Sequence, residues 1–356
     1  MSVSLHKSVA IILLSSRQEK ELVLDCLKSL AKTDYPKELI KTILVDNKST
    51  DDVVSAVKSQ YPEVTVIENK ENLGFTVGNN IGIRYALDHG YEYIVILNND
   101  TTVDKDWIKE MIAVADSDEK IGSVQPLIYI HGHTDIINTD GNQIHFLGFA
   151  YCGNYKKKIN AIDVVSKEIT YASGAGMMVK NRVFRELGLF EEKLFIYHDD
   201  VEFGWRMRMA GYKIFLAPKA KIFHKYVFSK PSNRKWYLME RNRFIVIFEN
   251  FKIRTLLLLL PASICMEIGL YWFAFTQGWL REKISADLYF INPINIIGIF
   301  HERKEKQKLR KIKDRDIISR FVGTIEFEDV SPILLTKVAN PLFHAYWKMV
   351  RPLIFW

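Results

Sequence analysis

Cysteine is scarce in this chain, which has 356 residues but only Cys26, Cys152 and Cys265. The three lie far apart and without paired spacing. Their pattern excludes a disulfide framework and a cysteine-based zinc site, and it suits a reducing compartment. Compositional bias is also missing. Hydrophobic residues make up 48% and charged residues 26%, which excludes a disordered, collagenous or coiled-coil chain.

The first 251 residues have almost no net charge, because they hold 33 lysines and arginines and 32 acids. Residues 252–356 hold 16 against 10, so most of the net charge of +7 belongs to the last third. The length suggests about two domains, and the charge places them at 1–251 and 252–356. We expect no secretory signal peptide, because the apolar run VAIILLSS is too short for a signal core with a cleavage site.

Short apolar runs alternate with helical patterns in the first hundred residues. Strands are expected at 9–14, 41–47, 64–69 and 93–100, and helices at 19–32, 53–60 and 78–89. Continuous β-branched strands between helices predict an α/β fold with a mostly parallel sheet flanked by helices. Ligands of such sheets bind beyond the carboxyl ends of the strands. Polar residues stand at those ends, including Ser15, Arg17, Asp46 and Asn98 to Asp100.

The segment ILVDNKSTDD places Asp46 at the end of a strand. A carboxylate there can accept from a nucleotide base, and helix capping by the residues that follow is an equal alternative. The next loop, NKENLGFTVGNN, holds Gly74 and Gly78 before a helix. Backbone N–H groups at a helix start favour a diphosphate, but a plain turn explains two glycines as well.

The segment VILNNDTTVD has the chemistry of a metal site. Asn98 and Asp100 are predicted to point to the same side of a strand end, because side chains alternate along a strand. A carboxylate with a neighbouring oxygen ligand can hold a hard divalent ion on a diphosphate. An asparagine-rich turn that precedes a helix at 105–116 is the alternative.

The order VDN, ENLGFTVGNN, LNNDT, SGAGMMV, HDDVEFGWRMRMAG and ERNR resembles a family 2 glycosyltransferase of the GT-A fold. It is most similar to the branch with rhamnosyltransferases and galactofuranosyltransferases of cell-surface glycans. The resemblance covers about residues 8–251. It implies a Rossmann-like GT-A domain followed by a C-terminal helical, membrane-associating region.

The resemblance also implies residue roles. Asp199 and Asp200 match an acidic pair whose second member is the general base, and Asp100, Asn98 and His224 match the metal site. Asp46, Asn72, Gly74 and Phe75 match the nucleotide pocket. Further candidates for contact with the nucleotide are Ser15, Arg17, Asn79, Asn99 and Arg241. Two positions depart from the family pattern: Ser15-Ser16 stands where Asn-Tyr is usual, and Asn98 replaces an acid.

The chemistry of HDDVEFGWRMRMAG supports the same role independently. Inverting glycosyl transfer needs a base that takes the proton of the acceptor hydroxyl. Two adjacent carboxylates such as Asp199 and Asp200 are not both easily ionised when buried, so one is expected to hold a proton. Glu202 and Arg206 lie four residues apart, and one helical turn would pair them. A solvated acidic helix start is the alternative.

Two further segments leave alternatives open. SGAGMMV either lets a backbone approach a sugar or makes a tight bend. In ERNR, Arg241 and Arg243 either clamp a diphosphate or pair with Glu240 and Glu249 on a helix face.

After Arg254 the chain carries a long apolar stretch in which Glu267 is the single charged residue, and Pro261 lies within it. By length it could span a bilayer, although Pro261 and Glu267 disfavour a simple span. A second apolar segment precedes HERKEKQKLRKIKDR, where residues 303–315 hold eight lysines and arginines and two acids. This order is typical of a peripheral or monotopic anchor on an anionic membrane surface. A buried helical hairpin with a solvated charged helix is the alternative, and nucleic-acid binding is not expected because interleaved aromatics are missing.

Together these observations predict an inverting, metal-dependent glycosyltransferase. The resemblance implies a UDP- or dTDP-linked nucleotide-sugar donor, Mg²⁺ or Mn²⁺, and a polyprenol- or dolichol-linked saccharide acceptor at the cytoplasmic face of the cell membrane. A sugar nucleotidyltransferase is the alternative enzyme, although it would have no use for an acceptor-side base. A non-catalytic membrane or nucleic-acid adaptor is the alternative outside catalysis.

Overall fold

A computed structural model describes residues 7–225, 232–326 and 333–356. The chain divides into two compact units. Unit 1 comprises Met1–Asn142, Cys152–Asp200 and Tyr212–Val227, and unit 2 comprises Gln143–Tyr151, Val201–Gly211 and Phe228–Trp356. The domain boundary predicted at residue 251 lies between two helices of unit 2 and stays a prediction.

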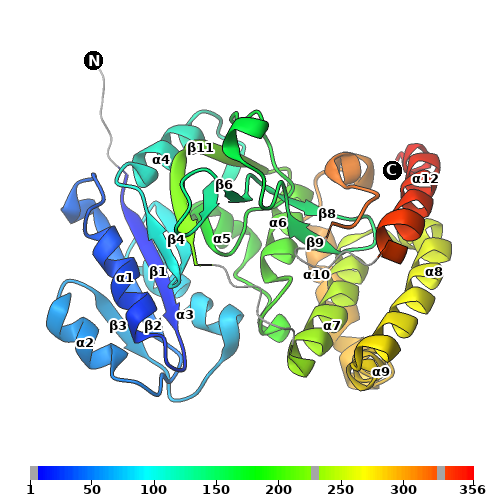
Figure 1. The fold of residues 1–356 in the computed structure, drawn as a ribbon, viewed down its shortest axis with the longest axis horizontal. Coiled ribbons are helices and arrows are strands. Elements are labelled where there is room, and N and C mark those ends of the chain that lie inside the picture. The colour runs from blue at the N-terminus through cyan, green and yellow to red at the C-terminus, as the bar shows by residue number, and fades with distance from the viewer. Residues whose placement is uncertain (1–6, 226–231, 327–332) are drawn as a thin grey trace. The chain divides into compact units, whose positions relative to one another are not determined.

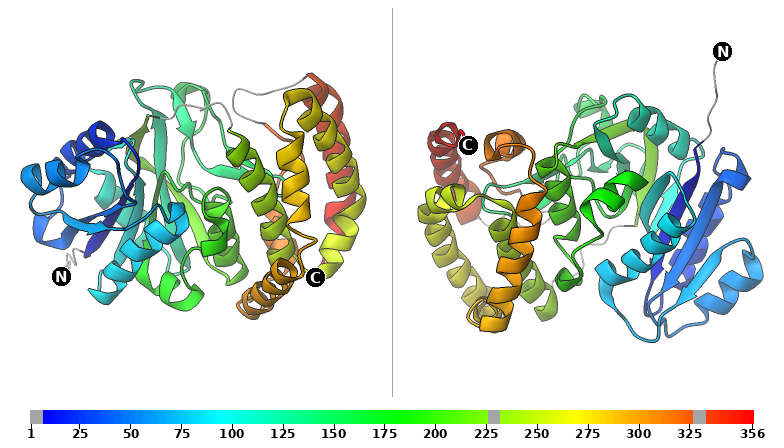
Figure 2. Two further views of the ribbon diagram at one scale, coloured as in Figure 1. Left: turned by 90° about the horizontal axis from the view of Figure 1, so that it is seen from below. Right: turned by 180° about the vertical axis from the view of Figure 1, so that it is seen from behind.

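Unit 1 is a mixed β-sheet with helices on both faces (Figures 1 and 2). Its strands are β1 (Val9–Ser15), β2 (Ile40–Asp46), β3 (Thr65–Glu68), β4 (Tyr93–Asn98), β5 (Thr101–Val103), β6 (Ile121–Ile130), β7 (Ile137–Thr139), β10 (Gly176–Lys180) and β11 (Lys213–His224). Its helices are α1 (Lys20–Leu30), α2 (Val53–Gln60), α3 (Gly74–Asp88), α4 (Trp107–Asp116) and α5 (Asn181–Leu187). The first four strands and the helices between them confirm the alternation predicted from the sequence.

The strand order is β3-β2-β1-β4-β10-β6-β11-β5, with β7 beside β6. Strands β1 to β4 are parallel, whereas β10 is antiparallel to β4 and β6, and β5 is antiparallel to β11. The expectation of a mostly parallel sheet is therefore too simple for its second half. Register brings Ser15 opposite Asp46 and Leu14 opposite Asn98, so the polar ends of three strands lie at one edge.

The two faces of β1 explain how the helices are placed. Val9, Ile11 and Leu13 belong to the core cluster that includes side chains of α1, α2 and α4. The alternate residues Ile12 and Leu14 face α3, because a Cβ at Gly82 or Gly78 would lie 2.6 or 2.5 Å from them. Gly78 was expected where a loop enters the helix at 78–89. Helix α3 begins four residues earlier, at Gly74, so Gly78 lies inside it and lets the helix approach the sheet closely.

Unit 2 is helical apart from parts of β8 (Asn142–Ile144) and β9 (Ala150–Cys152). Most of α6 (Asp199–Met209) belongs to it, with α7 (Asn233–Asn250), α8 (Ile253–Gln277), α9 (Leu280–Leu288), α10 (Pro293–Lys308), α11 (Asp314–Ile317) and α12 (Asn340–Val350). Trp205 of α6 makes edge contacts with Phe251 and Phe321, at ring-centroid distances of 4.6 and 4.8 Å. This aromatic cluster is part of the core of unit 2.

The end of α10 is attached to the end of α7. Three side chains donate to carbonyl groups at the C-terminus of α7: Arg303 to Phe248 and Phe251, Gln307 to Glu249 and Asn250, and Arg310 to Asn250. The last carbonyls of a helix have no partner within it, and cations there are favourable. Part of the basic run that we expected on a membrane surface therefore caps a helix instead.

Candidate active site

Asp46 is the last residue of β2, opposite Ser15 at the end of β1, and it is buried. Its Oδ1 accepts a hydrogen bond of 2.8 Å from the Ser15 hydroxyl, and the backbone and hydroxyl of Ser49 also donate to the carboxylate. Arg17 and Lys48, in the loops that follow the two strands, have positive φ angles of 59°. The carboxylate is thus held in one orientation at the strand edge, and its contact with a nucleotide stays a prediction.

The start of α3 is bound to the loop before α6. Gly74 has φ of +81°, and a Cβ there would lie 2.6 Å from the Phe195 ring. Its N–H donates to Asn72 Oδ1, and the N–H groups of Phe75 and Thr76 donate to the Phe195 carbonyl. These three N–H groups are already used inside unit 1. The predicted contact of Asn72, Gly74 and Phe75 with a nucleotide would use other atoms and stays a prediction.

Asn79 and Asn99 both make hydrogen bonds within unit 1. The Asn79 amide donates to the Phe75 carbonyl over 2.9 Å. The Asn99 amide donates to the Leu14 carbonyl and to Glu19 Oε2 over 2.8 and 2.7 Å. The predicted contacts of these asparagines with a nucleotide would therefore use the remaining atoms of their side chains.

Asp100 and His224 are brought together by strand pairing. His224 is opposite Thr101 in the β11–β5 ladder, and His224 Nε2 lies 3.1 Å from Asp100 Oδ1. Strand β4 ends at Asn98 and a turn precedes β5. The expected alternation of Asn98 and Asp100 along one strand is therefore wrong, and Asp100 owes its position to the turn and to β11.

The Asp100–His224 pair fits a divalent metal ion by its chemistry. Oδ1 of Asp100 is buried and accepts no well-formed hydrogen bond among the described residues, so its closeness to His224 Nε2 is an electrostatic contact. The other ring nitrogen, Nδ1, lies 3.5 Å from Asn138 Oδ1. A proton on Nδ1 would leave Nε2 as the ligand atom, which is how metal-bound histidines are usually oriented. Within the described ranges, no group of three or more His, Cys, Asp or Glu side chains forms a complete metal cage, so a ligand's oxygens or water would complete the site.

Asp199 and Asp200 begin α6. Burial, and next to it the charge of Asp200, raise the pKa of Asp199 well above its usual range. Asp200 Oδ2 accepts a hydrogen bond of 3.0 Å from the Gly174 N–H, which favours the ionised form of that carboxyl group. Asp199 is thus the acid that resists ionisation, which agrees with the expectation that one member of the pair holds a proton. Asp200 is the member whose carboxylate is held by a backbone donor.

The loop before this pair is strained. Phe195, Tyr197 and His198 have φ angles of 64°, 71° and 61°, a region that costs a residue other than glycine about 1–2 kcal/mol. Such outliers persist where the surrounding structure holds them and cluster at functional sites. The Phe195 carbonyl is held by two N–H groups of α3, so contacts within unit 1 maintain the strained approach to Asp199.

Gln125 is a residue of the site that sequence reasoning missed. It is fully buried on β6, and its Oε1 accepts a 2.8 Å hydrogen bond from the Ser173 N–H, next to the Gly174 that donates to Asp200. Its Nε2 has no hydrogen-bond partner among the described residues. A buried glutamine inside an otherwise apolar strand was the available signal. A tight bend is present in SGAGMMV, because the Gly176 N–H donates to the Ser173 carbonyl. The approach of a sugar to this backbone stays a prediction.

Further along α6, the predicted pairing of Glu202 and Arg206 is confirmed. Arg206 Nε and NH2 donate to the two oxygens of Glu202 over 3.1 and 2.7 Å. Burial alone would raise the pKa of Glu202, but the charges of Arg206 and Lys306 lower it to about 2. Two acids of one helix, Asp199 and Glu202, therefore have opposite pKa shifts.

The two arginines of ERNR differ in their contacts. Arg243 pairs with Glu240 and Glu267, each at 2.8 Å, so its pairing on the helix face is confirmed for Glu240. The Arg241 guanidinium donates to Asn242 Oδ1 and lies over the rings of Tyr237 and Tyr289. Arg241 is a member of unit 2, and its predicted contact with a diphosphate stays a prediction.

Exposed large hydrophobic side chains are concentrated in unit 2. Among the described residues, Val165 is the only one outside the range 253–355. Helix α8 is long and apolar enough to cross a membrane by length and composition. Its Glu267 carboxylate, expected to disfavour a span, is paired with Arg243 and Lys283, and Pro261 lies inside the continuous helix.

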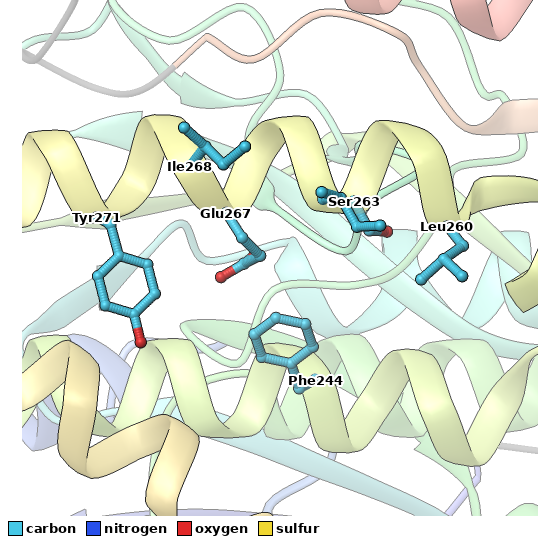
Figure 3. A pocket seen from close by; sticks show the side chains of 7 residues that line it. Phe244, Leu260, Ser263, Glu267, Ile268 and Tyr271 are labelled. Carbon is cyan, nitrogen blue, oxygen red and sulfur yellow. The ribbon is translucent and has the colours of Figure 1, made fainter.

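A groove of about 490 Å³ lies between α7 and α8 (Figure 3). It is lined by Phe244, Leu260, Ser263, Ile264, Glu267, Ile268 and Tyr271. Most of its lining is apolar, and Leu260, Ile264 and Ile268 are also exposed on the outer surface of α8. The groove is therefore continuous with the exposed apolar side of that helix.

Solved structures define the class of fold. The structure of GalNAc-T7 with UDP, GalNAc and Mn²⁺ superposes with a TM-score of 0.59 at 16% identity, covering 82% of this chain and 59% of that one. Mannosyltransferase PcManGT from Pyrobaculum calidifontis, in complex with GDP-Man and Mn²⁺, has a TM-score of 0.52 at 16% identity, with coverage of 86% and 88%. These likenesses show a GT-A-like mixed α/β fold.

The chain belongs to glycosyl transferase family 2, whose sequence pattern matches residues 11–188. The hexosyltransferase Agl10 of low-salt glycan biosynthesis in Haloferax volcanii is 25% identical over 213 residues, which are 57% of this chain and 66% of that protein. The N-acetylglucosaminyl-diphospho-decaprenol L-rhamnosyltransferase of Mycobacterium tuberculosis is 24% identical over 229 residues, or 59% and 74%. The family predicted from the sequence motifs is confirmed, and the protein is a glycosyltransferase.

Proposed function

We propose that the chain is an inverting, divalent-metal-dependent glycosyltransferase. It would move a sugar from a UDP- or dTDP-linked donor to a hydroxyl group of a saccharide acceptor. The acceptor would be linked to polyprenol or dolichol and reached at the cytoplasmic face of the cell membrane. The observation that carries the proposal is the Asp199–Asp200 pair at the start of α6, with its strained approach and its opposed environments.

Asp200 is the proposed base. The acceptor oxygen would attack the anomeric carbon of the donor while its proton moves to the carboxylate of Asp200 and the bond to the diphosphate breaks. One displacement of this kind inverts the anomeric centre. The Gly174 N–H holds the ionised carboxylate in place, and the raised pKa of Asp199 limits the negative charge that gathers beside the sugar.

Asp100 and His224 are the proposed metal ligands, with Asn98 nearby on the chain. The buried Oδ1 of Asp100 and the proximity of His224 Nε2 support this assignment. A bound Mg²⁺ or Mn²⁺ would neutralise the charge that develops on the leaving diphosphate. The two structural relatives named above contain Mn²⁺, which favours a metal-dependent reaction here without selecting the ion.

A lipid-linked acceptor is supported by the surface of unit 2 and by the decaprenol named for the mycobacterial relative. Extended apolar surface on a folded protein marks an interaction site. Here it accompanies an apolar helix that is mostly exposed and four exposed cations of the basic run, Lys304, Lys311, Lys313 and Arg315. The exposed Lys308 is not counted with them, because it pairs with Glu305 on its own helix. These features are those of a protein that lies on, or is anchored in, an anionic membrane.

The test is a binding screen of nucleotide sugars with and without Mn²⁺, read as a shift of the melting temperature, because ligand binding stabilises the folded state. The stabilising donor is then offered with polyprenyl-diphosphate-linked saccharides, and the anomeric configuration of the product is determined. Transfer with inversion supports the proposal. Retention of configuration, or formation of a nucleotide sugar from a sugar phosphate and a nucleoside triphosphate, would contradict it.

A further inference from the structure

Lys306, near the end of α10, is buried between two carboxylates of unit 2. Its Nζ lies 2.8 Å from Glu202 Oε1 and 2.7 Å from Glu249 Oε2, and the lysine is 4% exposed. With Arg206, which pairs with Glu202, these residues form a cluster of two acids and two cations. We call Glu202, Arg206, Glu249 and Lys306 the α6 clamp.

The basic run of the C-terminal third thus supplies an internal counter-ion that its sequence did not reveal. Lysine is almost never fully buried unless it is paired. A buried ion pair is nevertheless weak evidence for stability, because apolar side chains of similar volume often stabilise a fold equally well. We therefore consider how the clamp orients helix α6.

The clamp acts on the helix that begins with the proposed base. Glu202 follows Asp200 by two residues, within the first turn of α6. Its Oε1 is contacted from two elements, by Arg206 of the same helix and by Lys306 of α10, while Oε2 is held by Arg206. Contacts from two directions fix the rotation of a helix about its axis, which one pair within the helix does not do.

The attachment of α10 is itself rigid. Arg303 and Gln307, on either side of Lys306, donate to carbonyls at the end of α7. The first half of α10 carries the exposed side chains Ile294, Ile297 and Phe300. One helix therefore bears part of the exposed apolar surface at its start and reaches α6 at its end.

We propose that Lys306 is a positioning residue for the reaction: through Glu202 it sets the orientation of α6 and hence of the Asp200 carboxylate. The inference rests on the function proposed above. A carboxylate displaced by about 1 Å loses on the order of a hundredfold in rate without any loss of donor binding. The role predicted for Lys306 is therefore an effect on kcat and not on the binding of the nucleotide.

The test compares four full-length variants with the wild-type protein. Lys306→Met removes the cation, and because it leaves excess negative charge in the clamp it can fail to fold. The double variant Lys306→Met/Glu249→Gln removes one charge of each sign and keeps the clamp neutral. Lys306→Arg restores the cation, and Lys308→Met is the matched control, since Lys308 is exposed and pairs with Glu305 on its own helix.

We expect the double variant to fold, to bind the nucleotide donor within about twofold of wild type, and to lose about 10- to 100-fold in kcat. Lys306→Arg should recover part of that loss, and Lys308→Met should match wild type. A double variant with kcat within twofold of wild type would overturn the proposal. So would a parallel loss of donor binding, or a double variant that does not fold, because Lys306 would then serve folding alone.

The controls separate this inference from the proposed function. If wild type and Lys308→Met transfer sugar and the double variant does so equally well, only the role of Lys306 is wrong. If wild type and Lys308→Met transfer no sugar from any donor to any acceptor, the proposed function fails, and the inference fails with it.

Discussion

Asp199 and Glu202 lie three residues apart on α6, and both carboxyl groups are buried. Asp199, in unit 1, has the carboxylate of Asp200 beside it, and its pKa is raised. Glu202, in unit 2, has Arg206 and Lys306 beside it, and its pKa falls to about 2. Burial alone therefore does not reveal what a carboxyl group does. The charge of the neighbouring side chain decides whether a buried carboxyl group can exchange a proton or stays ionised in an ion pair.

The same contrast extends to the rest of the two units. In unit 2, Glu240 and Glu267 share Arg243 and Lys283. In unit 1, the strand ends carry Asp46, which accepts from two hydroxyl groups, and Asp100, whose buried Oδ1 has no well-formed hydrogen bond among the described residues. The buried acids named here in unit 2 are paired with cations, whereas Asp46 and Asp100 of unit 1 lie at strand ends without a lysine or arginine partner among the described residues. Their contact with a ligand or a metal stays a prediction.

The largest effect is expected from Asp200→Asn. Loss of the base should lower transfer by about a hundred- to ten-thousand-fold while donor affinity stays close to wild type, because an acceptor proton is all that Asp200 is proposed to handle. Transfer to the lipid-linked acceptor and nucleotide binding are measured side by side. Asp163→Asn, at an exposed position, is the control. More than half of wild-type turnover in Asp200→Asn would rule out this assignment.

Substitution of Glu202 and of Asp199 should change the free energy of unfolding in opposite directions, or lower it only for Glu202. Glu202→Gln leaves buried cations with one counter-charge fewer and should destabilise the fold by about 3–5 kcal/mol. Asp199→Asn removes a carboxyl group that resists ionisation, so its stability should equal or exceed that of wild type. Denaturant unfolding at neutral pH measures both. Equal losses in the two variants would mean that the contrast between the two acids is not real.

The pH dependence follows from the same shifts. The pKa of Glu202 is lowered from 4.5 to about 2, so its contribution to stability is complete above about pH 4.5 and is lost as the pH falls toward 2. The pKa of Asp199 is raised from 3.8, so its contribution is present below that pH and is lost as the pH rises through the raised value. Glu202→Gln should reduce the loss of stability that accompanies a fall in pH below about 4.5. Asp199→Asn should reduce the loss of stability that accompanies a rise in pH above 3.8. An unchanged curve in either variant would contradict the corresponding shift.

A smaller effect is expected at the proposed metal site. Asp100→Ala should weaken nucleotide binding at least about tenfold in Mn²⁺ and little in EDTA, because the ligand acts through the ion. Isothermal titration in the two buffers measures the difference, with the exposed Glu119→Ala as control. Equal weakening in both buffers would make Asp100 a structural residue.

The smallest effects concern the membrane. The full-length protein should float with anionic vesicles, high salt should release part of it and alkaline carbonate most of it, since apolar burial is not screened by salt. Replacing exposed cations such as Lys304 and Lys311 by Gln should weaken binding by about 1 kcal/mol each. Lys306→Arg should not change it, because that residue is internal. Complete retention in carbonate would indicate that α8 spans the bilayer, and a protein that never floats would exclude membrane binding.

A truncation after residue 251 would not test membrane binding separately from the role of Lys306. It would remove Lys306 and leave Glu202 and Glu249, both fully buried, with one of their cations missing. Point variants at exposed positions therefore give the sharper comparison between the two units.

Local patterns predicted the first four strands of unit 1 and the helices between them well, because β-branched runs and helical spacing report burial directly. They also predicted the Asp199–Asp200 pair and the Glu202–Arg206 contact, since neighbours within one helical turn are fixed by helix geometry. They failed at Asn98 and Asp100, where a turn interrupts the strand, and they placed the start of α3 at Gly78, four residues too late. A two-residue turn and a close helix–sheet contact depend on packing rather than on periodicity.

By itself the sequence determined the family, the alternating first half of the sheet, the acid pair and the apolar character of the C-terminal third. Each of these features depends on residues that are close in sequence or on composition. The family resemblance also placed His224 with Asp100, and strand pairing explains how they meet. Only the tertiary structure decided that Gln125 supports the loop bonded to Asp200, and that Lys306 lies beside Glu202. The contacts of Asp100, Gln125 and Lys306 join residues about 50 to 125 positions apart in a chain of 356. Strand register and helix packing determine such contacts, and no local pattern encodes them.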